Sequence, residues 1–237
     1  MSNQIFISVI VPVFNEVKNI DKVISSVRAY FSLNSHFQYE IIFIDDGSRD
    51  ETYSKLTPYS NVKDIRIFKN LQNFGKGYSI QKGVLNAQGT SILFLDADLS
   101  TEISELDKFM PYIQEKCPVI IGTRRDLGSN IVQKQPLLRS VFGMTYIFLV
   151  KLILNLSVSD INCGFKCIEK NVALELFKNL RSLRWGFDAE ILYKASKKRY
   201  RIQEVAITWK DNVHSKVSII KDSLRSLLEL FRIRLWV

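Results

Sequence analysis

The sequence predicts an α/β protein with a mostly parallel central sheet that helices flank on both faces. Two observations lead to this prediction. In the first half of the chain, short runs rich in β-branched residues alternate with segments whose apolar residues recur at helical spacing. Polar residues follow directly after three of the apolar runs, and ligands bind beyond the carboxyl ends of the strands in sheets of this class.

The first three elements follow from the local pattern. Residues 7–13 (ISVIVPV) form a short β-rich run, which predicts a buried strand. Residues 20–31 place apolar side chains at the spacing of one helix face, which predicts a helix. Residues 40–44 (EIIFI) predict the second strand, and the polar run 45–48 (DDGS) predicts a turn after it.

The later elements of the first half repeat this alternation. Residues 65–68 (IRIF), 91–95 (SILFL) and 119–122 (VIIG) predict three further strands. Residues 75–86 and 102–113 predict the helices that connect them.

The composition excludes some classes of protein. With 46% apolar residues and five prolines, the chain lacks the composition of a disordered protein. The formal net charge of +9 predicts an anionic partner, such as nucleic acid, a nucleotide, a phospholipid or a phosphate-bearing substrate. The basic residues are spread along the chain and no nucleic-acid-binding motif occurs, so we expect no nucleic-acid partner.

Cysteine usage and the N-terminus indicate a cytoplasmic protein. Cys117, Cys163 and Cys167 do not form the pattern of a disulfide framework, and His36 and His214 do not complete a zinc site with them. We therefore expect reduced cysteines. The N-terminal sequence MSNQIFISVIVPVFNE lacks the basic start of a signal peptide and is expected to form the first strand.

The motif Asp96-Ala97-Asp98 follows the apolar run 91–95 directly. Because side chains alternate along a strand, the two carboxylates can point the same way, with the small Ala97 between them. Carboxylates this close repel each other unless a positive group joins them. The motif predicts either a divalent metal site or a turn or helix cap, where Asp is common. Polar clusters at 12–16 and 45–48 also end strands, and three clusters on one sheet edge favour a binding site.

The sequence lacks the two common phosphate-binding motifs of α/β proteins. Neither a G-x-G-x-x-G motif nor a P-loop follows the first strand. Gly75-Lys76-Gly77 opens the helix predicted at 75–86, where backbone amides and Lys76 can approach a phosphate, although an ordinary flexible helix start fits equally well. A metal on Asp96 and Asp98 would neutralise a diphosphate without a P-loop.

Several strings of residues together resemble a known enzyme family. SVIVPVFNE, IIFIDDGSRDET, NFGKG and FLDADLS resemble, in order and spacing, the inverting family-2 glycosyltransferases, whose nucleotide-sugar-binding fold is called GT-A. DINCGFK, RWGFDAEILYKA and EVAITWKDNVHSK are similar to the dolichyl-phosphate β-glucosyltransferase and bacterial polyprenyl-phosphate glycosyltransferase branch. The resemblance implies a single GT-A catalytic domain over 1–237, with a nucleotide-sugar-binding half (1–125) and an acceptor- and membrane-facing half (126–237).

The resemblance implies donor-binding roles for residues at matching positions. Asp96 and Asp98 would hold Mg²⁺ or Mn²⁺ against the diphosphate of the sugar nucleotide, and a carboxylate at 45 or 46 would contact the base or ribose. The implied nucleotide-sugar-binding residues are Pro12, Val13, Asn15, Glu16, Asp45, Asp46, Lys76, Asp96 and Ala97.

The catalytic residues that the resemblance implies are Asp188, Asp98 and Arg124. Asp188 occupies the place of the catalytic base in many relatives, and it is also expected to be the N-cap of a helix over 189–197. A phosphate acceptor is already anionic and needs little general-base help. In that case Asp188 is expected to orient a positive group instead.

A lipid-phosphate acceptor requires cations for its head group. The expected acceptor-phosphate residues are Arg124, Arg139, Lys166, Trp185 and Lys216. Arg124 and Lys216 match family positions that line the site, within GTR and HSK. The sequence departs from the family pattern at His214, where a glycine is expected before Ser-Lys.

Two segments indicate a membrane surface as a further partner. Residues 137–158 are the most hydrophobic part of the chain, but Arg139 and Lys151 interrupt the roughly 20 apolar residues that a span needs. We expect a helix that lies in the membrane interface or packs under the acceptor groove. Residues 218–237 form an amphipathic basic pattern, which predicts a C-terminal helix that binds an anionic membrane or packs on the core.

The function expected from the sequence is metal-dependent inverting transfer of a hexose, with UDP-glucose favoured as donor, to a polyprenyl phosphate. We expect a peripheral enzyme on the cytoplasmic face of a membrane, where a membrane protein could be a docking partner. The alternatives are a GDP-mannose-dependent mannosyltransferase, a transferase with a glycan acceptor, or an inactive nucleotide-sugar-binding module that recruits a membrane partner.

Overall fold

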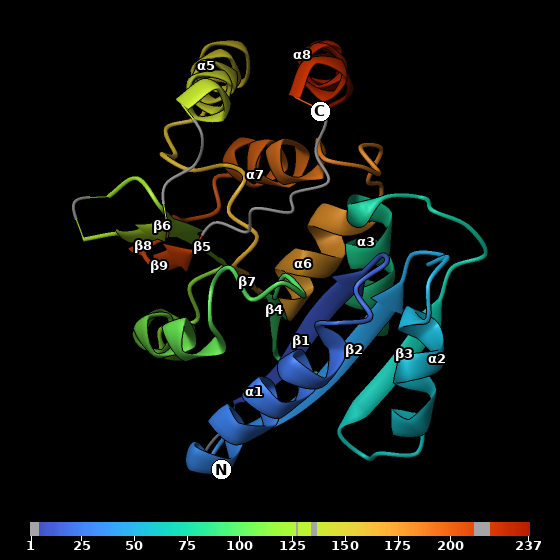
Figure 1. Ribbon diagram of the computed structural model, residues 1–237. Helices are drawn as coiled ribbons and strands as arrows, with labels where there is room; N and C mark the ends of the chain where they lie inside the picture. The colour runs from blue at the N-terminus through green and yellow to red at the C-terminus, as the bar shows by residue number, and fades with distance from the viewer. Residues whose placement is uncertain (1–4, 127, 134–136, 211–218) are drawn as a thin grey trace.

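The structure, a computed structural model, describes residues 5–126, 128–133, 137–210 and 219–237. Its centre is a seven-stranded sheet in the order β3-β2-β1-β4-β7-β5-β8 (Figure 1). The strands are β1 Phe6–Val13, β2 Gln38–Asp45, β3 Ile65–Lys69, β4 Ser91–Phe94, β5 Val119–Thr123, β7 Lys166–Glu169 and β8 Ile202–Ala206.

Most neighbouring strands of this sheet are parallel. Only β7 is antiparallel to its neighbours β4 and β5. Val13 at the end of β1 pairs with Asp45 at the end of β2, which pairs with Lys69 at the end of β3. The carboxyl ends of these strands therefore meet at one edge. The mostly parallel α/β sheet expected from the sequence is confirmed.

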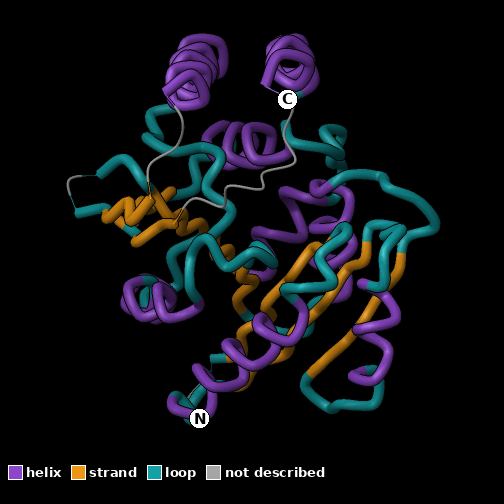
Figure 2. The backbone as a smooth tube through the Cα atoms, in the orientation of Figure 1, coloured by secondary structure: helices purple, strands orange, loops and turns teal. Residues whose placement is uncertain are grey.

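Helices cover both faces of the sheet, as Figure 2 shows. They are α1 Ile20–Leu33, α2 Thr52–Leu56, α3 Lys76–Asn86, α4 Met110–Gln114, α5 Leu137–Leu154, α6 Lys170–Phe177, α7 Phe187–Lys197 and α8 Ile219–Trp236, with 3₁₀ helices at Thr57–Tyr59 and Ile103–Lys108. The core divides accordingly. Along β2, Ile41 and Phe43 pack with α1 and α4, whereas Ile42 and Ile44 pack with α3, α6 and α7.

The prediction of one continuous helix over 102–113 is wrong in detail. A 3₁₀ helix, Ile103–Lys108, comes first, and the α-helix α4 begins only at Met110. Pro111 explains the break, because proline has no backbone N–H to donate to the preceding turn and is tolerated only at the start of an α-helix.

The second half of the chain adds two features outside the main sheet. β6 Asn130–Gln133 and β9 Thr208–Lys210 form a separate parallel pair. Helices α5 and α8 pack against each other at one end of the molecule, beyond α7 (Figure 1). Across the described ranges, none of the helices combines the length and apolar character needed to cross a membrane.

Each of these two helices has a buried and an exposed side. Ile147 and Val150 of α5, and Leu230 and Ile233 of α8, are buried in the core cluster that contains α7. Large apolar side chains on both helices are also exposed. Packing on the core, one of the two expectations for the C-terminal helix, therefore describes its buried side, whereas membrane contact stays a prediction for both helices.

Candidate active site

The loops after β1 and β2 bind each other at the carboxyl edge of the sheet. The Asp46 N–H donates to the Val13 carbonyl at 2.8 Å. The Asn15 N–H donates to Ser48 Oγ at 2.9 Å, and Asn15 Oδ1 accepts from the Arg49 N–H at 2.8 Å. Asn15 has φ of +55°, a left-handed conformation that Asn adopts more readily than most residues. The two predicted loops therefore form one connected wall.

Pro12 and Val13 are the last two residues of β1, and Glu16 lies in the loop that follows. The Glu16 N–H donates to Thr52 Oγ1 at 2.8 Å, and its carboxylate accepts from Asn19 Nδ2 at 2.6 Å. The structure thus brings the expected first-loop residues beside the polar loop that follows β2.

The adjacent carboxylates Asp45 and Asp46 have different surroundings. Asp46 accepts three hydrogen bonds, from Asn70 Nδ2 at 2.8 Å and from the N–H groups of Phe74 at 3.0 Å and Gly75 at 2.8 Å. Asp45 is fully buried, and its Oδ2 makes no hydrogen bond to any residue that the structure describes. A buried carboxylate oxygen without a partner is unfavourable. Asp45 is therefore the member of this pair with acceptor capacity left for a ligand.

Asp96 and Asp98 lie just beyond the end of β4, with Lys76 beside them. Lys76 Nζ is 2.5 Å from Asp96 Oδ1, and Asp98 Oδ1 accepts from the Ser100 N–H at 3.0 Å. Burial acts to raise the pKa of Asp96, but Lys76 and nearby cations outweigh it and hold this pKa below its usual value. Burial and the Asp96 carboxylate raise the pKa of Asp98. Lys76 therefore balances one carboxylate of the pair, and no cation of a described residue forms an ion pair with the other.

The second and third residues of α3 use their backbone donors within the protein. The Gly77 N–H donates to the Arg184 carbonyl at 3.3 Å, and the Tyr78 N–H donates to the Leu183 carbonyl at 2.9 Å. These two amides are therefore not the ones that would approach a phosphate. The side chain of Lys76, at the first position of the helix, lies beside Asp96 instead.

Lys166 is completely buried beneath the site. Its Nζ donates to Asp188 Oδ1 at 2.5 Å and to the carbonyls of Cys163 at 2.5 Å and Ile161 at 3.0 Å. An ammonium group has three hydrogens, so these acceptors use all of them. The expected direct contact between Lys166 and an acceptor phosphate is therefore absent from this arrangement.

Asp188 is not the N-cap that the sequence predicts. Helix α7 begins at Phe187 and its N-cap is Gly186, which places Asp188 in the first turn. Its carboxylate turns to Lys166 instead of the backbone donors of the helix. Burial raises the pKa of Asp188, although Lys166 and Lys76 both act to lower it.

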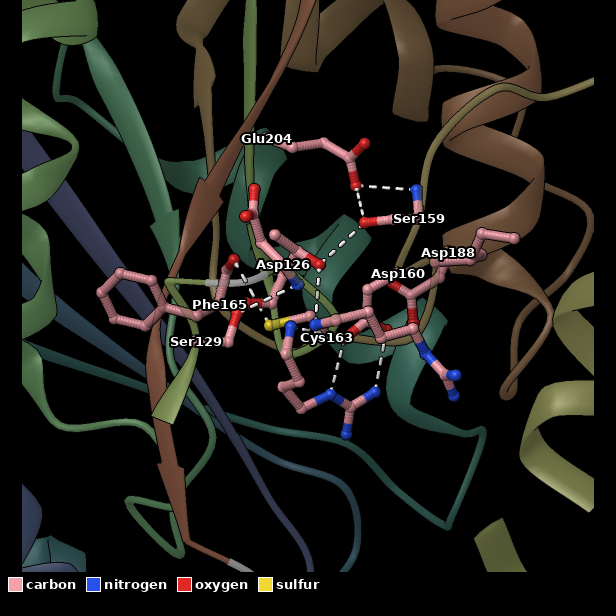
Figure 3. Close-up of polar contacts among 12 residues, drawn as sticks. Asp126, Ser129, Ser159, Asp160, Cys163, Phe165, Asp188 and Glu204 are labelled. Carbon is pink, nitrogen blue, oxygen red and sulfur yellow. Dashed lines mark hydrogen bonds and ion pairs between the residues drawn. The ribbon is translucent and has the colours of Figure 1, made fainter. Parts of the chain in front are cut away.

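Arg124 is held by a residue that the sequence analysis did not select. Its Nε and Nη2 donate to the two carboxylate oxygens of Asp160 at 2.7 and 2.8 Å, and its backbone N–H donates to Asp160 Oδ2 at 3.1 Å (Figure 3). Asp160 is fully buried, and the Arg124 guanidinium also lies 5.1 Å from the centre of the Trp209 ring. Burial acts to raise the pKa of Asp160, but Arg124 outweighs it and the pKa is lowered. Asp160 opens the string DINCGFK, and that resemblance was its one signal in the sequence.

Ser159 and Glu204 were also missed. The N–H and Oγ of Ser159 donate to Glu204 Oε1 at 2.7 and 2.5 Å, as Figure 3 shows. Ser159 Oγ is 2.8 Å from Thr123 Oγ1 at the end of β5. These contacts attach the segment that contains Asp160 to two strands of the main sheet. They therefore fix the carboxylate to which Arg124 donates its two side-chain hydrogen bonds. Residues separated by 36 and 45 positions leave no pattern from which such contacts could be read.

The structure describes some of the remaining expected site residues and leaves others out. Trp185 is 47% exposed, and Lys76 Nζ lies 5.9 Å from the centre of its ring. Ala97 is buried between the two carboxylates. Arg139 belongs to α5, but its side chain lies outside the described part of the structure, as does all of Lys216.

Asp96 and Asp98 fit a divalent cation whose coordination a ligand completes. Their carboxylate oxygens are the hard donors that Mg²⁺ and Mn²⁺ prefer. Gly164 packs so closely on Asp96 that an added Cβ would overlap its carboxylate, which fixes the position of this group. In the part of the chain that the structure describes, no group of three or more His, Cys, Asp or Glu residues could hold a metal by itself. The other ligands would be a diphosphate and water.

A family comparison agrees with this geometry. The family model described as glycosyl transferase family 2 matches residues 8–177. The chain belongs to this family. The match covers the ends of β1, β2 and β4 with the loops that follow them, and it extends through α6, so the enzyme class expected from the motifs is confirmed.

Curated relatives of this family-2 glycosyltransferase match almost its full length. The dolichyl-phosphate beta-glucosyltransferase of Drosophila melanogaster is 32% identical, over 98% of this chain and 74% of its own. The Dictyostelium discoideum enzyme of the same name is 33% identical, over 98% and 75%. The Homo sapiens enzyme is 29% identical, over 97% and 75%.

Solved structures with the same fold are more distant in sequence. Glucosyl-3-phosphoglycerate synthase from Mycobacterium tuberculosis, in complex with Mn²⁺, UDP-glucose and phosphoglyceric acid, superposes with a TM-score of 0.73 and 16% identity. The superposition covers 97% of this chain and 79% of that one. At this identity the likeness establishes the GT-A fold and nothing further.

Proposed function

We propose that this glycosyltransferase moves glucose from UDP-glucose to a dolichyl or related polyprenyl phosphate. The observation that carries the proposal is the match of 98% of the chain to dolichyl-phosphate beta-glucosyltransferases. The paired carboxylates, Asp96 and Asp98, support it because they lie at the carboxyl edge of the sheet, where a nucleotide ligand is expected.

On the donor side, the first loops would receive the nucleoside. Asp45 has a buried oxygen with no hydrogen-bond partner among the described residues, and this oxygen would accept from a base or ribose, while Asp46 holds the neighbouring turn. Asp96 and Asp98 would hold Mg²⁺ or Mn²⁺, which when bound supplies charge neutralisation for the leaving diphosphate. The Mn²⁺ and UDP-glucose in the complex of the mycobacterial enzyme support this assignment.

The transfer step needs little proton chemistry. An anionic oxygen of the acceptor phosphate attacks the anomeric carbon on the face opposite UDP. The new carbon–oxygen bond forms as the bond to the β-phosphate oxygen breaks, and the electron pair of that bond leaves with UDP. An α-linked donor then gives a β-linked product. Because the attacking oxygen already carries charge, no base is required, and Asp188 serves to hold Lys166.

Arg124 is the cation best placed on the acceptor side. Asp160 accepts from its Nε and Nη2, and we assign the third guanidinium nitrogen, Nη1, to the acceptor phosphate. A guanidinium whose orientation is already fixed loses less entropy on binding an anion than a freely rotating side chain does.

The apolar ends of α5 and α8 would place the enzyme on the membrane that contains its acceptor. Their exposed large apolar residues are Phe148, Leu152, Leu228, Phe231, Leu235 and Trp236. Lys151, Arg232 and Arg234 are exposed among them. Apolar contact combined with positive charge favours an anionic lipid surface. We place the enzyme on the cytoplasmic side, in keeping with free thiols at Cys117, Cys163 and Cys167.

A donor screen tests the proposal. The full chain is incubated with short-chain polyprenyl phosphate and radiolabelled UDP-glucose, UDP-galactose, UDP-N-acetylglucosamine or GDP-mannose, with Mn²⁺ or EDTA. We expect label in lipid from UDP-glucose alone, only with metal, and not with Asp98→Ala. Labelling from GDP-mannose would replace the glucosyl assignment with a mannosyl one. Donor binding without labelled lipid would contradict the acceptor assignment, and failure to label any glycan acceptor as well would indicate a binding module.

A further inference from the structure

Glu190 is a buried carboxylate that the proposed reaction does not use. It lies on α7 and is only 1% exposed. Glu190 Oε2 accepts from the Ser182 N–H at 2.7 Å, and the Arg181 N–H lies 3.1 and 3.2 Å from its two oxygens. Lys194 pairs with it at 2.6 Å. Glu190 therefore holds the backbone at the start of the segment 181–186.

The segment 181–186 in turn holds the first turn of α3. Two of its carbonyls accept the N–H groups of Gly77 and Tyr78. The two backbones are in close contact, because a Cβ added to Gly77 would lie 2.6 Å from the Ser182 carbonyl oxygen. At Gly75 an added Cβ would lie 2.5 Å from the Leu183 carbonyl oxygen. A shift of this segment therefore shifts the start of α3.

A second buried carboxylate holds the other side of the same turn. Asp46 accepts from the N–H groups of Phe74 and Gly75, directly before Lys76. Lys76 thus lies between two stretches of backbone, each attached to a buried acid. Its ammonium lies 2.5 Å from Asp96 Oδ1 and 5.9 Å from the ring centre of Trp185, which belongs to the segment 181–186.

We propose that Glu190 is a positioning residue for nucleotide binding, which acts through the segment 181–186 to fix Lys76 beside Asp96. The inference rests on the proposed function in one respect, namely that Lys76 contacts the diphosphate of the donor. Long lysine side chains lose affinity for a ligand when they must be ordered on binding, and a fixed backbone at both sides of Lys76 reduces that loss.

A pair of variants separates positioning from simple stabilisation. Glu190→Gln keeps the shape but presents an NH₂ group to one of the two backbone donors. Lys194→Met keeps the carboxylate and removes the ion pair, together with bonds from Lys194 to the carbonyls of Leu176 and Asn179 at the end of α6. Both variants are expected to lower the melting temperature. Only Glu190→Gln is expected to weaken nucleotide binding, whereas a merely structural role predicts that both variants weaken it alike.

A double-mutant cycle with Lys76 is the deciding experiment. UDP binding in the presence of Mn²⁺ is measured by calorimetry for the wild type, Glu190→Gln, Lys76→Ala and the double variant. We expect Glu190→Gln to raise the Kd about tenfold, or about 1.4 kcal/mol, in the wild-type background. In the Lys76→Ala background the same change should alter Kd less than about twofold, because residues that act through one group are not additive. Glu175→Gln, at an exposed position on α6, is the matched control and should leave Kd unchanged.

Equal effects of Glu190→Gln in both backgrounds would overturn the proposal. If the full chain binds neither UDP nor GDP, the proposed function fails, and the positioning claim is then tested by amide hydrogen exchange. Glu190→Gln should speed exchange at Gly77 and Tyr78 about tenfold relative to Glu175→Gln, since their carbonyl partners belong to the segment that Glu190 holds. Unchanged exchange at these two amides would also overturn it.

Discussion

The proposed donor side and the proposed acceptor side of the site use their charged residues differently. On the donor side, Asp96 and Asp98 lie at a strand end and remain partly exposed. On the acceptor side, Lys166 is paired with Asp188, and Arg124 is paired with Asp160, with at least one fully buried partner in each pair. The donor side therefore presents charges to a ligand, whereas most charges of the acceptor side hold one another. Substitutions in the two regions should accordingly impair different properties of the enzyme.

The largest effect is expected for Asp98→Ala on the donor side. Loss of one carboxylate from the metal pair should reduce transfer about a thousandfold, since metal charge stabilisation contributes several kcal/mol and each tenfold in rate is about 1.4 kcal/mol. The melting temperature should stay near that of the wild type, because Asp98 is partly exposed. Initial rates with saturating UDP-glucose measure the effect, and Asp21→Asn on the exposed face of α1 serves as control. Retention of a tenth of the activity would contradict the assigned role.

Lys166→Met should affect stability first. It leaves Asp188 buried without its cation, and removal of one partner of a buried ion pair lowers the free energy of unfolding by about 3 kcal/mol or more. Urea unfolding measures the change. The double variant Lys166→Met with Asp188→Leu should recover much of this loss, because no charge is then left unpaired. If the double variant is no more stable than the single one, the pair is not the source of the effect.

Asp160→Asn should impair the acceptor step specifically. The amide cannot accept both guanidinium donors, so Arg124 loses its fixed orientation and kcat/KM for the polyprenyl phosphate should fall about a hundredfold. Arg124→Lys should behave similarly, since it keeps the charge but loses the fork. The KM for UDP-glucose should not change in either variant. If the KM for UDP-glucose rose as much as the KM for the polyprenyl phosphate, the two regions would not have separate roles.

The smallest effect is expected at the surface of α8. Phe231→Ser combined with Leu235→Ser removes two exposed apolar side chains, and should reduce binding to anionic vesicles about fivefold or more, with transfer to a water-soluble short-chain acceptor unchanged. Co-sedimentation with phosphatidylserine-containing vesicles measures the binding. Leu33→Ser, at an apolar position on α1 that is at least as exposed as either, is the control and should have no effect.

The sequence predicted which polar residues lie at the carboxyl ends of the strands, because the evidence for their position is local. Apolar runs followed by polar residues gave β1, β2 and β4 and placed Asp45 and Asp96 at their ends. Strand ends that are adjacent in a parallel sheet bring such residues together without any further information.

The acceptor side was predicted poorly because its contacts are not local. The antiparallel strand β7 inserts between β4 and β5, and this places Lys166 below the site instead of at its surface. In β7, Lys166–Glu169, two apolar residues lie between charged ones, and this apolar run is too weak to be recognised as a strand. The contacts of Asp160 with Arg124, and those of Glu190 with the N–H groups of Arg181 and Ser182, are equally hidden, because the sequence pattern does not show which groups the fold brings together.

Calorimetric titration of UDP-glucose with Mn²⁺ into three proteins, the wild type, Asp98→Ala and Asp160→Asn, tests the division between the two sides most directly. The account predicts that Asp98→Ala weakens donor binding about a hundredfold, whereas Asp160→Asn leaves the Kd within about twofold of the wild type despite its loss of transfer. Equal loss of donor binding in both variants would contradict it, because Asp160 would then belong to the donor site.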